Sequence, residues 1–229
     1  MRLHRFFIKT PITEQKIVID DEDLLHQWRN VFRYNTGTEL LVFNGDGKEY
    51  RTVIERIANR EVVLEIVEER EGIDCSSGPI LYQALIKKDN MEWIVQKATE
   101  LGVSKIVPIL SERSEKKGFN LERARKIAVE ASEQCGRADV PVIEDSQELL
   151  DVGFDKNILT VAFDRSGLPI DGKLVSKDYN LTTIFIGPEG GWSEREIEKF
   201  KEAKVEIFSL GELTLRAETA AVVALSKFL

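Results

Sequence analysis

Two short segments near the end of the sequence combine glycines with charged side chains. The first, IGPEGG, surrounds Pro188 and Glu189 with Gly187, Gly190 and Gly191. Glycine has no Cβ atom and proline fixes φ, so a ligand can press closely against the main-chain N–H groups of such a loop. These groups suit an anionic or polar ligand. A loop of this kind also serves merely to turn a chain, so it does not define a site by itself.

The second segment, LGELTLRAETA, adds apolar and charged groups. Its leucines suit a flat aromatic ring held by main-chain groups, and they are Leu210, Leu213 and Leu215. Arg216, Glu218 and the earlier Glu189 provide a guanidinium and two carboxylates, which stabilise charge or move protons. A structural salt bridge from Arg216 to either carboxylate is the alternative. Thr219 is expected to donate a hydrogen bond at a helix start, because no activating base adjoins it.

Each segment follows a predicted strand and precedes a predicted helix. The run TTIFI is β-branched and aromatic, and Ser193 with Glu196 forms the capping-box pattern that starts a helix. A third strand, in NILTVAFDRSG, runs into a polar glycine turn. The strand ends at Phe163, Ile186 and Leu210 are therefore expected at one edge of a sheet, where the ligands of α/β proteins collect.

Several common functional classes lack their motifs in this sequence. There is no GxGxxG after the first strand, no GKS/T phosphate loop and no GxSxG nucleophile turn. Cys75 and Cys135 lie far apart without a Cys/His cluster, which predicts reduced thiols and no metal site.

Length and composition predict a protein of two domains. The chain has 229 residues, of which 42% are hydrophobic and 31% charged. No apolar run approaches the roughly 20 residues that cross a bilayer, and the N-terminus does not resemble a secretory signal, so the expected location is the cytoplasm. The net charge of −8 argues against general affinity for nucleic acid, although an acidic protein can carry a local basic face.

The N-terminal part of the chain, up to about residue 70, reads as mostly β. NGDG predicts a hairpin, and DEDLLHQWRNVF has helical spacing after an aspartate start, with one apolar face formed by Leu24, Leu25, Trp28, Val31 and Phe32. These elements predict a small barrel-like domain with one short helix. The polar stretch EGIDCSSGP at residues 71–79 is the expected domain boundary.

After this boundary, strands alternate with helices. PILYQALIK and SKIVPIL read as strands around a helix that Asp89 and Glu92 are expected to cap and that Gly102 ends. A long helix is expected to start at Asn120 and to run through EASEQCGR. The alternation predicts an α/β domain with a parallel sheet. From the pattern alone, this sheet would be open and doubly wound.

The motifs IGPEGG, LG and LTLRAETA, in this order, closely resemble those of the 16S ribosomal RNA (uracil-N3)-methyltransferase family, a member of the SPOUT class. RLHRFF, MEWIVQKATELGV and EASEQCGR extend the resemblance over nearly the whole chain. The resemblance implies a PUA-like β-barrel at residues 1–72 that binds RNA. It also implies a SPOUT domain at residues 73–229, with a deep trefoil knot, that binds S-adenosyl-L-methionine and forms a homodimer.

The resemblance also implies roles for individual residues. Arg216 and Glu189 are the expected catalytic residues, with Glu218 as an alternative general base. The expected cofactor-binding residues are Phe163, Ile186, Gly187, Pro188, Glu189, Gly190, Gly191, Leu210, Gly211, Leu213, Leu215, Arg216 and Thr219.

A second set of residues is expected to bind 16S ribosomal RNA or the small ribosomal subunit. This set consists of Arg2, His4, Arg5, Arg33, Arg113, Lys116, Lys117 and Arg137. A solvated strand edge is the alternative for His4, and simple solvation is the alternative for the basic loop at residues 113–117. Arg137 has the alternative of an ion-pair array on the long helix.

Two other functions remain open from the sequence. A related SPOUT enzyme would methylate a ribose 2′-hydroxyl or a tRNA base. A non-catalytic assembly factor would bind RNA with the same fold, without turnover.

Overall fold

The computed structural model describes residues 3–115, 118–170 and 181–228, and the chain divides into two compact units. The first unit contains Met1–Asp74 and Ser132–Val140, and the second contains Cys75–Ala131 and Pro141–Leu229. The return of residues 132–140 to the first unit was not expected from the sequence. It depends on contacts between distant residues, such as the hydrogen bond of 2.9 Å from the Phe7 N–H to the Glu133 carboxylate.

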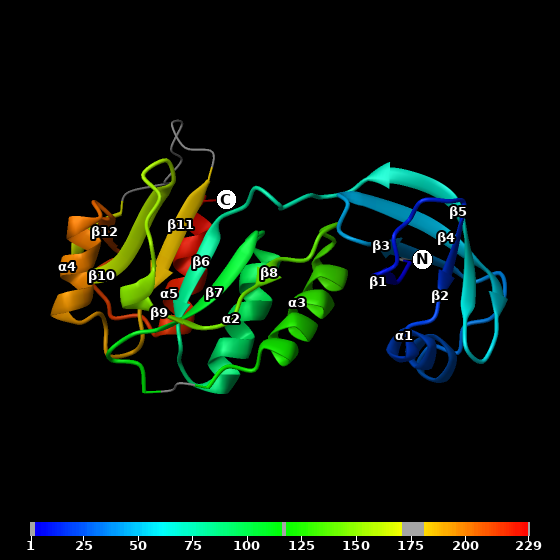
Figure 1. Cartoon of the computed structure of the whole chain (residues 1–229), viewed down its shortest axis with the longest axis horizontal. Coiled ribbons are helices and arrows are strands. Elements are labelled where there is room, and N and C mark those ends of the chain that lie inside the picture. Colours follow the sequence, from blue (N-terminus) through cyan, green and yellow to red (C-terminus); the bar gives the residue numbers. More distant parts are fainter. Residues whose placement is uncertain (1–2, 116–117, 171–180, 229) are drawn as a thin grey trace. The chain divides into compact units, whose positions relative to one another are not determined.

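The first unit is a curled five-stranded sheet packed on a short helix (Figure 1). Its strands are β1 (Arg5–Phe7), β2 (Lys16–Ile19), β3 (Glu39–Phe43), β4 (Lys48–Ile57) and β5 (Val62–Glu71). They are ordered β1-β3-β4-β5-β2, with β1 parallel to β3 and the other neighbours antiparallel. Trp28 and Phe6 are buried in its core, with their rings 5.3 Å apart. Burial and a hydrogen bond to Asp46 raise the pKa of Tyr50.

The helix of the first unit differs in part from the prediction. Helix α1 (Glu22–His26) starts at Asp21, whose carboxylate accepts two backbone N–H groups, so the aspartate start is confirmed. The helix continues as a π-helical turn, Gln27–Val31. This wider turn changes the angular spacing of the side chains, and Val31 is 63% exposed, so its predicted place on the apolar face was wrong. Arg33 follows the helix, with φ +55°.

The second unit contains a parallel sheet, as predicted (Figure 1). Its strands are β6 (Ile80–Ala84), β7 (Lys105–Leu110), β8 (Val142–Ile143), β9 (Gln147–Glu148), β10 (Leu159–Pro169), β11 (Thr182–Ile186) and β12 (Glu206–Ser209). Their order is β12-β10-β11-β6-β7-β8, with β9 also paired to β7. Every pair is parallel. The strands β10, β11 and β12, which end near the predicted site, are therefore neighbours.

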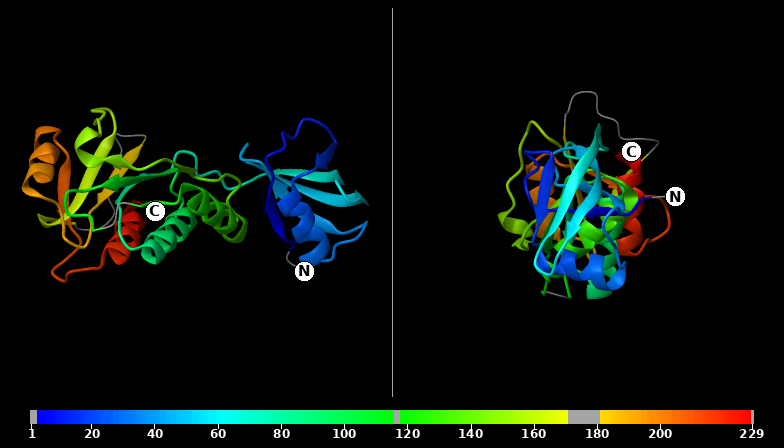
Figure 2. Two further views of the ribbon diagram at one scale, coloured as in Figure 1. Left: turned by 60° about the horizontal axis from the view of Figure 1, so that its bottom comes forward. Right: turned by 90° about the vertical axis from the view of Figure 1, so that its right-hand side faces the viewer.

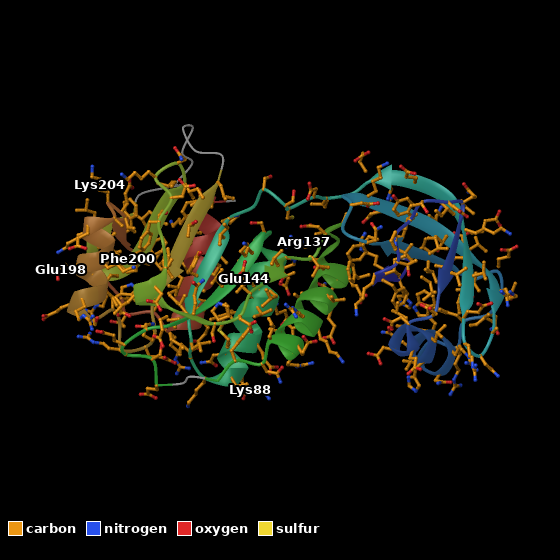
Figure 3. The ribbon with its side chains drawn as sticks, viewed as in Figure 1. Lys88, Arg137, Glu144, Glu198, Phe200 and Lys204 are labelled. Carbon is orange, nitrogen blue, oxygen red and sulfur yellow. The ribbon has the colours of Figure 1, made fainter. Side chains whose placement is uncertain are left out.

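The helices of the second unit bury their apolar sides against the sheet and one another. They are α2 (Lys88–Glu100), α3 (Leu121–Cys135), α4 (Glu194–Glu202) and α5 (Ala217–Leu225), with the short 3-10 helices η2 (Leu149–Asp151) and η3 (Ser226–Phe228). Phe200 of α4 is buried against Phe185 of β11, whereas Glu198 of α4 is exposed (Figure 3). Helices α2 and α5 lie side by side, and α5 also contacts β11 (Figure 2). The apolar α5 is thus covered in part by its own unit.

The helix caps test the local predictions. Gly102, with φ +76°, follows the end of α2, and the Asn120 side chain accepts a backbone N–H three residues later, as predicted. The predicted capping of α2 by Asp89 and Glu92 was wrong. The N-cap residue is Lys87, which makes no side-chain cap bond. The helix starts at Lys88, so Asp89 lies inside the first turn, where its charge can only favour the helix dipole.

The third predicted strand continues further than expected. DRSG was predicted to be a turn after the strand, but β10 runs to Pro169, and these residues form a bulge within it. Phe163 and Leu168 both pair with Phe208 of β12. A Cβ atom on Gly167 would lie 2.6 Å from the Phe208 carbonyl carbon, so the two backbones approach too closely for any side chain there.

Among the described residues, no helix is long and apolar enough to span a membrane. The trefoil knot implied by the resemblance stays a prediction.

Candidate active site between three strand ends

The glycine loop after β11 is a tight turn closed by a tryptophan. The Gly191 N–H donates to the Pro188 carbonyl at 2.9 Å, and Gly191 has φ +68°, which favours glycine. The Trp192 ring is buried against Gly187, where a Cβ atom would lie 3.1 Å from Trp192 Cε2. Trp192 Nε1 also donates to the Phe163 carbonyl at 3.0 Å, which joins the loop to β10.

The carboxylate of Glu196 joins this loop to the loop after β7. Glu196 and Ser193 form the predicted capping box at the start of α4. Glu196 is fully buried, and it also accepts the Ser111 hydroxyl at 3.1 Å and the Glu112 backbone N–H at 2.9 Å. The sequence indicated the cap but not this second connection, because Ser111 and Glu112 are far from Glu196 along the chain.

Arg113 adds a further contact between the same two loops. Its guanidinium donates to the Gly190 carbonyl at 3.2 Å, and a Cβ atom on Gly190 would lie 3.2 Å from Arg113 Cβ. Gly190 therefore allows the two backbones to lie close together. Arg113 was predicted to bind RNA as part of a basic loop. In the structure, its side chain contacts the glycine loop at Gly190.

The strand ends at Phe163, Ile186 and Leu210 enclose one cavity of about 430 Å3, which we call the first cavity. It is lined by Arg113, Phe163, Asp164, Arg165, Ile186, Gly187, Pro188, Glu189, Gly190, Gly191, Trp192, Ser209, Leu210, Gly211, Leu213, Thr214, Leu215, Ala217 and Ala220. The structure thus brings together most of the predicted cofactor-binding residues. The cavity combines main-chain polar groups from the loop with apolar side chains, which is typical of sites for small ligands.

A second cavity, of about 360 Å3, borders the same loop. It is lined by Ile86, Lys87, Asn90, Glu115, Glu189, Arg216 and Glu218. Glu189 lines both cavities, so the two cavities are adjacent. Arg216, which was predicted to bind the cofactor, lines the second cavity and not the first. Thr219 is exposed and lines neither of these two cavities.

Arg216 is not held in a salt bridge with either of the carboxylates that the sequence suggested. It precedes α5 as its N-cap residue, makes no side-chain cap bond and is exposed. Within the described part of the chain, no ion pair joins Arg216 to Glu189 or Glu218. The guanidinium is therefore available to a ligand in the second cavity.

Several lining residues were not identified from the sequence. Asp164 and Arg165 lie in the bulge of β10, which the sequence presented as a turn. Lys87 precedes α2 and Asn90 lies in its first turn, just after β6, another strand of the same sheet. That position was a usable signal, because loops at this edge line the ligand sites of α/β proteins.

The residues predicted to bind RNA are dispersed. Arg2, Lys116 and Lys117 lie outside the described residues. His4 is exposed, hydrogen bonded to Tyr34 and packed 4.7 Å from the Phe32 ring centre. Arg33 is also exposed.

The remaining two arginines of that set are buried. The Arg5 side chain is 8% exposed, pairs with Glu49 and donates to the Arg137 carbonyl. Arg137 is 2% exposed and makes two hydrogen bonds to Asp139, at 2.9 and 2.6 Å. It also lies beyond the end of α3, so it cannot take part in an ion-pair array on that helix. These contacts favour a structural role for both arginines.

No group of three or more metal-ligating side chains is found among residues 3–115, 118–170 and 181–228. Cys75 and Cys135 are not joined in a disulfide bond. In the parallel sheet, burial raises the pKa of Tyr82 of β6, whose ring stacks on Phe185 of β11.

Comparison with known proteins identifies both units. The family described as RNA methyltransferase domain matches residues 77–229, and the RNA methyltransferase PUA domain matches residues 29–67. Ribosomal RNA small subunit methyltransferase E of Rickettsia conorii is 30% identical over 235 residues, covering 99% of this chain and 95% of the relative. That of Bacillus subtilis is 32% identical over 247 residues, covering 98% and 95%.

A solved structure is similar over the same length. It is ribosomal RNA small subunit methyltransferase E from Neisseria gonorrhoeae bound to S-adenosyl methionine, with a TM-score of 0.86, 26% identity and coverage of 98% of this chain and 96% of that one. Fold and matched domains together define an RNA methyltransferase with a PUA domain. The chain belongs to the ribosomal RNA small subunit methyltransferase E family.

Proposed function

We propose that this protein transfers a methyl group from S-adenosyl-L-methionine to N3 of a uridine in 16S ribosomal RNA. The observation that carries the proposal is the pair of adjacent cavities, one built from glycine turns and leucines and the other from charged side chains, with Glu189 lining both. The relatives named ribosomal RNA small subunit methyltransferase E support the RNA substrate, and the resemblance of the sequence motifs to the uracil-N3 family supports the target atom.

The residues of the first cavity fit the cofactor. Its volume of about 430 Å3 lies within the range of small-molecule sites. Gly187 and Gly190 lie where side chains would collide with Trp192 and Arg113, so the backbone itself forms the wall there. Leu210, Leu213 and Leu215 offer apolar contacts for an adenine ring, and the loop amides offer hydrogen bonds to its polar groups. The bound cofactor supplies a methyl group activated by a positively charged sulfur.

The charged residues between the cavities would serve the transfer. Glu189 is placed to balance the positive charge of the donor, since it borders both cavities. Removal of the N3 proton leaves negative charge on the two uracil carbonyl oxygens. The Arg216 guanidinium in the second cavity is suited to stabilise this charge in the transition state.

Labelled cofactor and 16S ribosomal RNA or small subunits test this function directly. After incubation, the RNA is digested to nucleosides, and we expect the label in N3-methyluridine. Label in a ribose 2′-O-methyl nucleoside would contradict the proposed target atom. Cofactor binding measured by calorimetry, without any transfer, would indicate a non-catalytic assembly factor.

Replacement of Gly187 by alanine should weaken cofactor binding about tenfold. The new Cβ atom would lie 3.1 Å from the Trp192 ring, which is held by its hydrogen bond to Phe163 and has little room to move. Overpacking of this kind costs about 1–3 kcal/mol, and 1.4 kcal/mol is a tenfold change in affinity. Calorimetric titration with the cofactor measures the effect.

Gly153→Ala is the matched control for this variant. A Cβ atom on Gly153 meets nothing within 4 Å, so the Gly153→Ala variant should bind the cofactor with the same affinity as the unmodified protein. Equal affinity of Gly187→Ala and the control would mean that the glycine loop does not contact the cofactor.

The proposal includes a cytoplasmic homodimer, as the family resemblance implies. An exposed aromatic side chain on the α2–α5 layer supports a partner surface, since Trp93 of α2 is 41% exposed. Sedimentation equilibrium of the purified protein measures the assembly state, and a monomer at micromolar concentration would contradict the dimer.

A further inference from the structure

Glu218, which lines the second cavity, has a buried carboxylate oxygen without a hydrogen-bond partner among the described residues. Oε2 of Glu218, in the first turn of α5, is shielded from solvent and makes no hydrogen bond. A buried acceptor left unsatisfied costs about 1–3 kcal/mol, so such groups in native proteins generally have a functional or ligand-related reason. A ligand with a hydrogen-bond donor in the second cavity would satisfy this oxygen.

Three other side chains of the second cavity are donors. Asn90 provides an amide NH2 group, and Lys87 and Arg216 provide cationic donors. The carboxylates of Glu115 and Glu189 also line this cavity. The cavity thus offers the Glu218 acceptor together with donors from Lys87 before α2, from the first turn of α2 and from the residue before α5. Ile86, which is 3% exposed, adds an apolar contact.

This set of groups complements one edge of uracil. That edge presents an N3–H donor between the O2 and O4 carbonyl acceptors, so it requires an acceptor between donors. Cytosine presents an unprotonated N3 at the same position, and its lone pair would face a carboxylate oxygen. The hydrogen-bonding groups of the second cavity therefore favour uracil over cytosine.

We propose that the second cavity holds the target uracil and that Glu218 accepts the N3 proton. This assignment rests on the proposed function, which it deepens by naming the base subsite and the general base. In the transfer step, the N3 lone pair forms the bond to the methyl carbon, and the carbon–sulfur bond breaks with its electron pair left on sulfur. The N3 proton passes to Glu218 Oε2 and is later released to water.

Glu218 is better placed for this role than Glu189. Glu189 is exposed, so water already solvates its carboxylate. The Oε2 atom of Glu218 is buried and has no hydrogen-bond partner among the described residues, so it has a free acceptor position for a donor such as N3–H.

The test compares Glu218→Gln with the unmodified protein in single-turnover methylation of 16S ribosomal RNA. Glutamine has nearly the same shape but cannot take the proton, and we expect the rate to fall about 100-fold to 1,000-fold, as is usual for loss of a general base. The cofactor dissociation constant, measured by calorimetry, should stay within about twofold. Glu198→Gln removes an exposed carboxylate from α4 and should leave both quantities unchanged.

Two further readouts separate proton acceptance from a structural role. The residual rate of Glu218→Gln should rise about tenfold for each pH unit near neutrality, because only uracil that has already lost its proton can react; the unmodified protein should show a weaker dependence. RNA containing 5-fluorouracil, whose N3–H is more acidic, should restore part of the rate of the variant.

The outcomes distinguish this assignment from the proposed function. If the unmodified protein methylates N3 and Glu218→Gln is equally fast, or slow without the steeper pH dependence, the assignment of Glu218 is overturned and the proposed function stands. If the unmodified protein binds the cofactor but methylates another atom, both are overturned.

Discussion

Replacing Arg216 with alanine is expected to lower the rate of methyl transfer by about 100-fold to 1,000-fold without unfolding the protein. The size of this effect is that of removing one donor that stabilises negative charge in a transition state. The guanidinium lines the second cavity and forms no ion pair with Glu189 or Glu218 among the described residues. Under the proposed function, its loss removes a contact to the substrate, whereas no ion pair with Glu189 or Glu218 is lost from the described part of the fold.

The measurement for Arg216→Ala is a single-turnover rate at saturating cofactor, with a thermal melt and a cofactor titration on the same sample. The melting temperature and the cofactor affinity should match those of the unmodified protein. Arg125→Ala is the matched control, because it removes an exposed arginine of α3 that pairs with the exposed Glu122. An unchanged transfer rate in Arg216→Ala would remove this residue from the mechanism.

Replacing Glu196 with alanine is expected to lower the free energy of unfolding by about 3 kcal/mol. The carboxylate is fully buried and accepts hydrogen bonds from the Ser111 hydroxyl and from the backbone N–H groups of Glu112 and Ser193. Its removal leaves these donors buried without a partner, and hydrogen bonds to charged groups contribute about 1.5–3 kcal/mol each. Relaxation of the two loops offsets part of the summed cost of the three lost hydrogen bonds.

Urea unfolding monitored by tryptophan fluorescence measures this loss, and the same variant should bind the cofactor less tightly. Weaker binding is expected because Glu196 holds together the two loops that line the first cavity. Glu194→Ala removes an exposed carboxylate from the same helical turn and should change stability by less than about 0.5 kcal/mol. Equal urea midpoints for the two variants would show that the buried connection contributes nothing.

Local patterns predicted the elements of the site well. The strand before the glycine loop, the capping box at Ser193 and Glu196, and the end of α2 at Gly102 all depend on residues at most four positions apart. Predictions of this kind failed where a neighbour further along the chain changed the backbone. The bulge in β10 forms because Gly167 packs directly on β12, which no pattern within DRSG indicates.

The sequence by itself determined the class of fold and the two glycine-containing segments, IGPEGG and LGELTLRAETA. It could do so because strand runs, glycines and caps are local physical properties of the chain. It also indicated that three strand ends meet, because parallel strands of one sheet end at the same edge. Only the tertiary structure decided which charged groups remain available. Arg5 and Arg137 are buried with Glu49 and Asp139, whereas Arg216 and Glu218 line the second cavity.

The physical reason is that the partner of a charged side chain is chosen by packing and not by spacing. Arg5 donates to a carbonyl 132 residues away, and Glu196 accepts from Ser111 across 85 residues. Contacts between residues so far apart in sequence depend on how the helices and strands pack. Arginines with similar sequence surroundings are therefore divided into buried structural ones and ones available to a ligand only when the chain has folded.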